Sequence, residues 1–517
     1  MVTAPHHLAA QSGNAVLRDG GNAVEAMVAA AATIAVVYPH MNSIGGDGFW
    51  LISRPGEAPV GIDACGRAAA LATPEWYTKQ DLSAIPSRGP NAAITVAGAV
   101  SGWQVALQHS GSKLALARLL RDAIRYAREG TPVTQSQVDY TTKFLDELAP
   151  QPGYAAAFLR NGVAPPVHSL QRFAALADTL QQLAERGLDD YYRGELARRI
   201  AGELQRLGSP LRLEDLQRQH AQIVTPLRVQ LSVGEVFNMP PPTQGVASLM
   251  ILALFDRIRA GASADSFAHV HGLVEATKQA FMVRNRHVCD PATMNVDAAD
   301  FLADGALDER AHAIDLRKAR PWPEPAAKGD TVWMGAADAD GCMVSYIQSV
   351  YWEFGSGVVL EDTGVTWQNR GASFSLDPRS HVVLAPGRKP FHTLNPALAR
   401  LSDGRDMVYG NMGGDGQPQS QAAVFSRYAM FGQDLQQAVS APRWLLGRTW
   451  GQMSVGLKLE NRFDASVIEA LRAAGHELEV VDAYSDMVGH AGAIVRHRNG
   501  VLAGAADPRS DGVVAAH

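Results

Sequence analysis

Alternating apolar and polar residues predict a pair of strands in the last third of the chain. From Met343 to Val350, successive side chains point to opposite faces, with apolar residues on both. This period of two is typical of a β-strand. Residues 332–337 predict a second strand, and Asp340-Gly341 between the two predicts a tight turn, because glycine accepts the positive φ that such turns need. Thr331 therefore opens the first strand of a predicted hairpin.

Helical periodicity marks several other segments. Residues 23–37 are almost all small and apolar, with Asn22 before them and Glu25 in the first turn. Asn22 and Glu25 form a capping-box pattern, which predicts a capped helix buried on most faces. Leucines recur at helical spacing within residues 113–207. Further helices are expected at 246–259, 266–286, 420–428 and 465–474, and a strand near 408–411.

A glycine-rich turn at residues 39–50 leads into a strand. It is followed by neither the Gly-Lys-Ser/Thr of a phosphate-binding loop nor the helix of a dinucleotide fingerprint. We interpret it as a tight turn in a packed core.

Composition restricts the class of protein. The chain has 517 residues, of which 46% are hydrophobic and 19% charged, as in a globular protein with one large layered domain or two ordinary ones. The net charge of −6 gives no basic surface for nucleic acid or a membrane. No signal peptide is apparent, and the most apolar run, residues 24–37, is too short to span a bilayer.

Cysteine and histidine usage favours neither a disulfide framework nor a metal. Three cysteines without a CxxC pair fit a reducing compartment, so we expect a cytoplasmic protein with buried thiols. His271 and Glu275 share a helix face, but a metal needs about three ligands and no third is near in sequence. We therefore expect no metal and no cofactor.

Several motifs resemble one known family. The stretch 328–351 resembles the self-cleavage site of the γ-glutamyltransferase family of N-terminal-nucleophile (Ntn) hydrolases, and the resemblance covers nearly the whole chain. Residues 39–50 are similar to the family's Ser-Gly-Ile-Gly-Gly-Gly-Gly-Phe segment, and residues 240–245 to its Pro-Pro-Pro-Ser-Ser-Gly. The most specific further matches are Phe354-Gly355-Ser356-Gly357, Gly413-Gly414, Ala441-Pro442-Arg443 and Asp507-Pro508-Arg509-Ser510.

The resemblance implies an α+β fold, the αββα four-layer sandwich of Ntn hydrolases. It also implies self-cleavage between Asp330 and Thr331, at the end of a Pro-rich loop. Residues 1–330 would form a large subunit and residues 331–517 a small one, both within one αββα domain. We expect a heterodimer of these two pieces, and a dimer of such pairs remains open.

The resemblance makes Thr331 the nucleophile, which its chemistry supports. A threonine hydroxyl needs a base, and the freed α-amino group of Thr331, with an ordinary pKa of about 7.7–8, can serve as that base. The N–H groups of Gly413 and Gly414 are implied as the oxyanion donors, although a Gly-Gly pair can also be a simple turn. Ser349 is implied as a hydroxyl that orients the Thr331 amine, or else is only a strand residue.

Departures from the family pattern bear on the substrate. Cys65 replaces the arginine that holds the α-carboxylate of glutamyl substrates, and Arg67 two positions on is a weak substitute because Gly66 intervenes. Ser373 replaces the aspartate that binds the α-amino group. Losing both partners should disable γ-glutamyl binding.

Other departures add groups to the pocket. Tyr351 replaces an asparagine, and His392-Thr393 replaces a Ser-Ser pair. Arg370 adds a cation suited to a carboxylate, unless it faces solvent or pairs with Asp377. Arg370, His392, Thr393 and Tyr351 are thus the expected substrate-binding residues.

The chain most resembles the oxamate amidohydrolase branch, which implies a small-molecule amide substrate and release of ammonia. A glutathione hydrolase or transpeptidase, a β-lactam acylase, and an unprocessed inactive relative acting as a binding protein are the alternatives.

Overall fold

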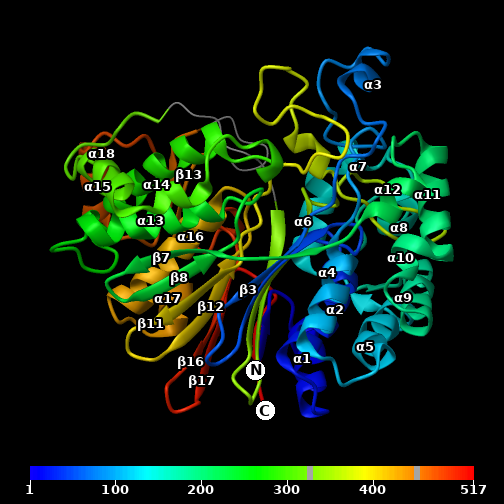
Figure 1. Ribbon diagram of the computed structural model, residues 1–517, viewed down its shortest axis with the longest axis horizontal. Coiled ribbons are helices and arrows are strands. Elements are labelled where there is room, and N and C mark those ends of the chain that lie inside the picture. Colours follow the sequence, from blue (N-terminus) through cyan, green and yellow to red (C-terminus); the bar gives the residue numbers. More distant parts are fainter. Residues whose placement is uncertain (323–329, 448–454) are drawn as a thin grey trace.

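Two β-sheets lie face to face in the middle of the protein, and helices cover the outer face of each (Figure 1). The computed structural model describes residues 1–322, 330–447 and 455–517. The N- and C-termini lie side by side at one end, where β1 (Val2–Ala4) pairs with β18 (Val513–Ala515). The four layers form the αββα sandwich that the sequence predicts.

The first sheet has seven strands, all antiparallel to their neighbours. Its order is β18, β1, β9 (Asp330–Ala337), β10 (Met343–Tyr351), β2 (Asp47–Ser53), β3 (Val60–Ala64) and β6 (Gln222–Val224). The predicted hairpin is confirmed as β9 and β10, and its first strand begins one residue before Thr331.

The second sheet has six strands and is also antiparallel throughout. Its order is β17 (Leu502–Ala506), β16 (Ala491–Arg496), β12 (Asp406–Asn411), β11 (Ala397–Leu401), β8 (Gly234–Asn238) and β7 (Leu227–Leu231). Two smaller sheets lie outside the sandwich: β13 (Trp444–Leu446), β14 (Leu457–Glu460) and β15 (Leu478–Val481), and β4 (Thr131–Pro132) with β5 (Leu170–Gln171).

A separate apolar core fills the space between the two main sheets. Met343 and Ile347 of β10 lie in this core, while Val344 and Tyr346 of the same strand lie in the core beneath the helices. The predicted alternation of faces is therefore confirmed. Trp333 of β9 crosses to the second sheet, where its indole fills the space above Gly410 and Gly492; a Cβ on either glycine would lie 2.1 or 2.5 Å from the ring.

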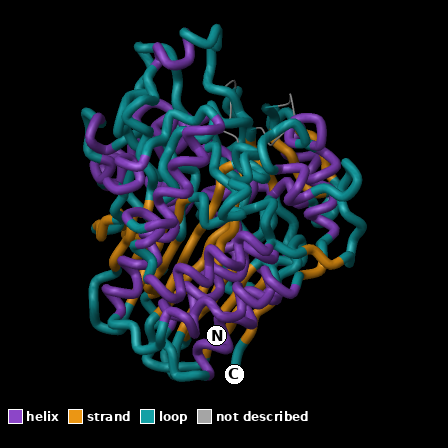
Figure 2. Tube along the Cα trace, turned by 90° about the vertical axis from the view of Figure 1, so that its right-hand side faces the viewer, coloured by secondary structure: helices purple, strands orange, loops and turns teal. Residues whose placement is uncertain are grey.

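The helices over the first sheet come from the first half of the chain, and Figure 2 shows several of them lying across its strands. They are α1 (His7–Arg18), α2 (Ala23–Val37), α4 (Ala99–Ser110), α5 (Leu116–Glu129), α6 (Gln135–Lys143), α7 (Leu145–Leu148), α8 (Tyr154–Phe158), α9 (Ala174–Arg186), α10 (Asp190–Arg193), α11 (Glu195–Leu207) and α12 (Leu213–Arg218). The short helix α3 (Pro74–Thr78) lies on a projection beyond the end of the sheet (Figure 1).

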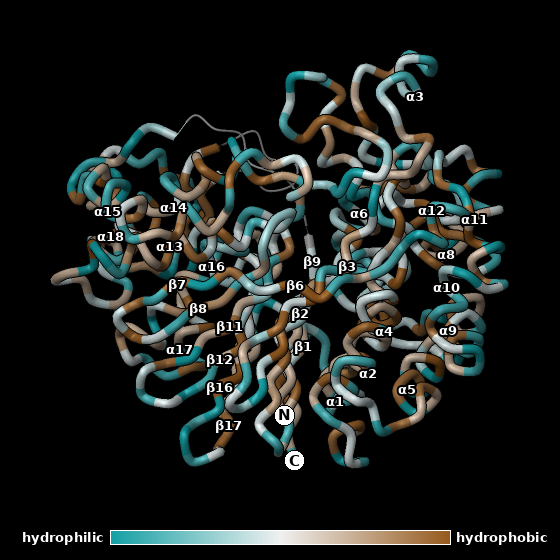
Figure 3. Tube along the Cα trace, viewed as in Figure 1, coloured by the Kyte–Doolittle hydropathy of each residue, from teal (hydrophilic) through white to brown (hydrophobic). Residues whose placement is uncertain are grey.

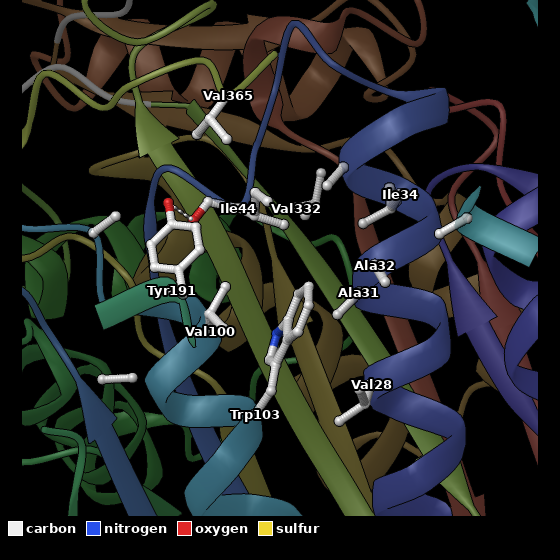
Figure 4. Packing of buried hydrophobic residues seen from close by; sticks show 14 of the residues in the cluster. Val28, Ala31, Ala32, Ile34, Ile44, Val100, Trp103, Tyr191, Val332 and Val365 are labelled. Atoms are coloured by element: carbon white, nitrogen blue, oxygen red, sulfur yellow. Dashed lines mark hydrogen bonds between the residues drawn. The ribbon is translucent and has the colours of Figure 1, made fainter. Parts of the chain in front are cut away.

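Helix α2 is the central helix of this layer. It spans the predicted residues, its capping box forms as predicted, and all of its side chains are buried. Figure 4 shows Val28 and Ala31 of α2 facing Trp103 of α4, with the strand that carries Val332 between the helices. Small residues on α2 allow this close approach to the sheet.

The helices over the second sheet come mainly from the second half. They are α13 (Gly245–Ile258), α14 (Phe267–His287), α15 (Asp304–His312), α16 (Gly416–Phe425), α17 (Leu435–Ser440) and α18 (Ala465–Ala473). Helix α16 begins four residues before the predicted start, because its first turn is glycine- and glutamine-rich and carries no apolar periodicity. It continues as a π-helical turn, Ser426–Met430.

Hydrophilic residues gather at the outer edges of the fold in Figure 3, and hydrophobic ones along the strands and inner helix faces. Within the described ranges, no helix combines the length and apolar character needed to cross a bilayer. All three cysteines are buried and free, as expected.

Candidate active site

Thr331 lies where β9 meets the start of helix α16. It is buried, with 1% of its surface exposed. Its Oγ1 accepts a hydrogen bond from Nε2 of Gln417, the second residue of α16, at 3.3 Å. A helix N-terminus presents free N–H groups and a partial positive charge, so Thr331 faces an environment that favours developing negative charge.

The neighbouring strand β10 is irregular opposite this residue. Gln348 pairs with Val332 in register, but Tyr351 pairs with Asp330, so the ladder shifts between them. Tyr351 has a positive φ of 84°, and the hydroxyl of Ser349 accepts its N–H at 2.8 Å. This bulge sets the direction of the Tyr351 side chain beside the start of β9.

Gly413 and Gly414 form the turn between β12 and α16. Their φ values of 116° and 53° lie in the left-handed region, which strongly favours glycine. Both carbonyls accept bonds from the first turn of α16, Gly416 to Gly413 at 2.8 Å and Gln417 to Gly414 at 3.2 Å. Among the described residues the two N–H groups have no acceptor, which leaves them as donors close to Gln417.

A buried polar network fixes this turn in place. Gln244, from the Pro-Pro-Pro-Thr-Gln-Gly segment, donates to the carbonyls of Gly414 (2.9 Å) and Thr393 (2.7 Å). Arg284 of α14 bonds the Gln244 side chain and forms a two-bond ion pair with Asp415 at 2.8 and 3.1 Å. The glycine turn and Thr393 are thereby held by the same side chain.

Arg370 is buried, and no carboxylate in the part of the chain that the structure describes pairs with it. It is fully shielded from solvent, and its Nη1 donates to the Thr393 hydroxyl at 3.4 Å. Its guanidinium stacks 3.8 Å from the centre of the Tyr351 ring. Its Nε and Nη2 have no acceptor within the described residues, so the predicted alternative that Arg370 faces solvent or pairs with Asp377 is wrong.

Burial sets the charge state of this arginine. It lowers the pKa of Arg370 to about 10, although Tyr351, Asp47 and Cys65 nearby partly offset the effect. The guanidinium therefore stays charged at neutral pH. A buried cation with two unpaired donors is costly, and an anionic ligand would supply the missing acceptors.

His392 is bonded to an aspartate that lies within the glycine-rich turn. Its Nε2 is 2.9 Å from Oδ2 of Asp47, and both side chains are fully buried. Burial lowers the pKa of His392 well below its usual range, aided by Arg370 and Lys389. Burial also raises the pKa of Asp47 to about 6, against the opposing effect of Arg370.

The positions where glutamyl-binding groups are missing have uncharged side chains here. Cys65 donates to the carbonyl of Gly66 at 3.4 Å, and burial raises the pKa of its thiol well above the usual value. Ser373 donates to the carbonyl of Arg370 at 2.9 Å. Arg67 bonds the carbonyl of Gly387, with 46% of its side chain exposed, so it does not replace the lost arginine.

The predicted residues thus gather on connected elements. Tyr351, Thr393 and Arg370 are in contact, Gln244 links Thr393 to the glycine pair, and Gln417 links the glycine pair to Thr331. Ser349 pairs with Asp47 across the sheet. Asp330 begins β9, but its side chain and the Pro-rich loop 323–329 lie outside the described residues.

Sequence reasoning missed Gln417, Gln244 and Asp47. Gln417 follows Gly413-Gly414 by three residues, and Gln244 lies in a segment that resembles the family. Both glutamines could therefore have been recognised as candidates from the sequence. Asp47 carried the clearest signal, because a charged residue inside a packed glycine-rich turn needs a partner.

The structure also supplies a third group beside His271 and Glu275. His476 lies 2.8 Å from His271, and the three side chains are buried together. Each is already bonded, since Lys278 donates to Glu275 at 2.6 Å and His271 Nε2 lies 2.8 Å from the carbonyl of Asp315. The sequence could not show this grouping, because His476 lies far along the chain.

The sequence matches one protein family along almost its whole length. The family model for γ-glutamyltranspeptidase matches residues 9–517. The chain belongs to the γ-glutamyltranspeptidase family. Its members that match here are amide-cleaving hydrolases, and this chain is an enzyme of that kind.

Relatives within the γ-glutamyltranspeptidase family differ in what they act on. The chain is 56% identical to the oxamate amidohydrolase proenzyme of Klebsiella pneumoniae, over 100% of this chain and 98% of that one. It is 40% identical to a glutathione hydrolase-like proenzyme of Bacillus subtilis, over 99% and 97% of the two chains. The crystal structure of cephalosporin acylase from Bacillus halodurans superposes with a TM-score of 0.91 at 34% identity, covering 100% of this chain and 95% of that one.

Proposed function

We propose that this enzyme is a self-processing Ntn amidohydrolase that releases ammonia from a small amide carrying a carboxylate, with oxamate as the leading candidate. The observation that carries the proposal is Arg370, a buried guanidinium beside Thr393 and Tyr351 with two donors that find no acceptor among the described residues. The relative named oxamate amidohydrolase proenzyme, 56% identical over the full chain, supports the choice of substrate.

Processing is the first step of the proposal. Water hydrolyses the peptide bond between Asp330 and Thr331, which leaves a carboxyl group on Asp330 and frees the α-amino group of Thr331. The products are subunits 1–330 and 331–517. Both relatives described above are proenzymes by name, which supports such a step. The two subunits remain together as a heterodimer within one αββα domain.

Hydrolysis then uses Thr331 as nucleophile and base. Its α-amino group takes the proton of Oγ1 as that oxygen bonds the amide carbon, and the N–H groups of Gly413 and Gly414 bond the resulting oxyanion. The amine passes the proton to the leaving nitrogen, and the C–N bond breaks to release ammonia. Water then attacks the acyl ester, giving its proton back through the amine, and the carboxylate product leaves.

The substrate pocket follows from the charges near Thr331. Arg370 bonds the substrate carboxylate, and its position over Tyr351 fixes the plane of the guanidinium. Thr393 and His392 line the same pocket. Cys65 and Ser373 offer no charge to hold the α-carboxylate and α-ammonium of a glutamyl group, which disfavours γ-glutamyl substrates.

A substrate panel tests this proposal. Ammonia or amine release is measured with oxamate, other small amides, glutathione, γ-glutamyl-p-nitroanilide and a β-lactam that carries a side-chain amide, with Thr331→Ala as the inactive control. We expect oxamate-like amides to be turned over at least about tenfold more efficiently than γ-glutamyl compounds, which corresponds to about 1.4 kcal/mol. Preference for glutathione or a β-lactam side-chain amide would favour the other two family activities, and an inert, uncut chain would favour a binding protein.

We also propose that the enzyme is located in the cytoplasm. Three free, buried cysteines fit a reducing compartment.

A further inference from the structure

Two departures from the family pattern meet in the structure. Asp47 stands where the family segment has the third glycine of its four-glycine run, and His392 stands where it has the first serine of a pair. These residues are 345 positions apart, and their side chains bond each other at 2.9 Å. Both are fully buried, so each supplies the partner that the other needs.

The surroundings of Asp47 define the direction of this bond. Oδ1 accepts three N–H groups, from Gly66 and Gly98 at 3.0 Å and from Gln368 at 3.1 Å. The other oxygen, Oδ2, is left for His392. An ionised carboxylate has only acceptors, so the imidazole must donate its Nε2–H to it.

This bond determines what the other ring nitrogen can do. A neutral imidazole that carries its proton on Nε2 has a lone pair on Nδ1. Nδ1 of His392 is buried, and no donor within the described residues bonds it. His392 precedes Thr393, whose hydroxyl bonds Arg370, and Arg370 lies close enough to His392 to help lower the pKa of its imidazole. The pocket therefore offers a buried acceptor near the cation.

We propose that Asp47 is a positioning residue that holds His392 in the Nε2–H form, so that Nδ1 accepts one N–H of the substrate's unsubstituted amide. The inference rests on the proposed function, with the substrate carboxylate on Arg370. Bonding one N–H at Nδ1 orients the amide nitrogen so that its lone pair can take the proton from the Thr331 amine. Primary amides next to a carboxylate are thereby selected over esters and N-substituted amides.

The Asp47–His392 pair also makes binding depend on pH. The titratable groups that surround the pair are Arg370, Lys389, Cys65, Tyr191, Tyr192 and Tyr346. Burial raises the pKa of the thiol and of the tyrosines, and that of Arg370 is about 10. Asp47, with a pKa of about 6, therefore changes its charge between pH 5 and 7.

Protonation of Asp47 reverses the bond. The carboxyl then donates to Nε2, the ring proton moves to Nδ1, and the pocket presents a donor to the amide N–H. The binding-competent fraction falls to about one-tenth at pH 5, so KM for the amide should rise about tenfold between pH 7 and pH 5. Protonation of the Thr331 amine also slows the reaction at low pH, but it lowers kcat rather than raising KM.

The test compares oxamate with monomethyl oxalate, an ester with the same carboxylate and no N–H, on the processed enzyme. For oxamate, KM should rise about tenfold from pH 7 to pH 5, while KM for the ester stays flat or falls. Asp47→Asn, which can donate to Nε2, should show a high oxamate KM at every pH and no such rise. Glu203→Gln is the matched control, since Glu203 is another buried carboxylate that accepts backbone N–H groups, from Glu361 and Asp362.

The outcomes separate the two proposals. If both compounds are hydrolysed but the oxamate KM does not change with pH, or changes in Asp47→Asn as in the wild type, the role of Asp47 is refuted and the proposed function stands. If neither compound is hydrolysed, both proposals fail. Should Asp47→Asn not fold, the amide–ester comparison on the wild-type enzyme alone decides the matter.

Discussion

At the scale of single residues, the burial of Arg370 costs stability but suits the binding of an anionic ligand. A buried guanidinium loses its hydration, and the described residues give it one hydroxyl and one aromatic face in return. Such groups reduce stability unless an acceptor is supplied. Conserving stability would favour an apolar side chain at this position, so the presence of arginine points to ligand binding.

Removing this charge should therefore weaken binding without weakening the fold. We expect Arg370→Ala to raise KM for oxamate, because a buried charge pair with the substrate is lost. The loss should correspond to about 2–5 kcal/mol of binding free energy. Arg370→Lys should recover only part of this loss, since an ammonium lacks the planar fork. Steady-state kinetics at pH 7.5 measures both.

Arg379→Ala provides the control for this prediction. Arg379 lies nine positions on, 89% of its side chain is exposed, and it pairs with Asp377, so its loss should leave KM unchanged. The melting temperature of Arg370→Ala should match that of the wild type or exceed it. Unchanged kinetics in Arg370→Ala would remove the main support for the proposed substrate.

At the scale of secondary structure, helix α2 depends on one carboxylate. Glu25 closes the capping box through Asn22, and its other oxygen accepts from Ser112, Lys113 and Leu114 at 2.6–2.7 Å. Burial alone would raise the pKa of Glu25, but these N–H and O–H bonds lower it below its usual value. The carboxylate thus ties the start of α2 to the loop before α5.

Glu25→Gln should destabilise the protein by about 1–3 kcal/mol at pH 7, because an amide leaves some of these donors unpaired. A lowered folded-state pKa means that this stability is present above the unfolded value of about 4.3 and is lost as pH falls through the folded value. The difference between the variant and its parent should therefore shrink below about pH 4.3.

Urea denaturation of the Thr331→Ala background, whose chain stays uncut, measures this at pH 7 and pH 4. Glu185→Gln is the control, since Glu185 is an exposed helical glutamate bonded to Gln181. A Glu25→Gln variant as stable as this control at pH 7 would contradict the assignment.

Local signals explain which elements the sequence could predict. The bounds of α2 and of the β9–β10 hairpin depend on caps, turn residues and periodicity within a few positions. Those of α2 match the prediction, and those of the two strands lie within two residues of it. The motif resemblance supplied the layer order. The contacts of Asp47 with His392 and of Glu25 with residues 112–114 join distant segments, and no local pattern encodes them. Arg370 could be singled out as a candidate from the sequence, but its burial depends on packing between segments that are distant in the chain.

At the scale of the whole molecule, the two proposed subunits share both sheets. In the first sheet, β1 of the large subunit pairs with β18 and β9 of the small one, and β10 of the small subunit pairs with β2 of the large one. In the second, β8 of the large subunit pairs with β11 of the small one. Separating the subunits would break strand ladders in both sheets and expose the core between them.

Cleavage should therefore change the chain without separating its parts. We expect the enzyme to run as two bands on a denaturing gel, the smaller holding 187 residues (517 − 331 + 1), and as one particle of full mass in native size exclusion. Thr331→Ala should remain one uncut, inactive band with the same native elution, because the nucleophile is lost and the sheets are not. Edman sequencing of the small band should begin at Thr331. An active enzyme that stays uncut would refute the Ntn mechanism. If the enzyme is active and its small subunit begins at another residue, that residue and not Thr331 is the nucleophile.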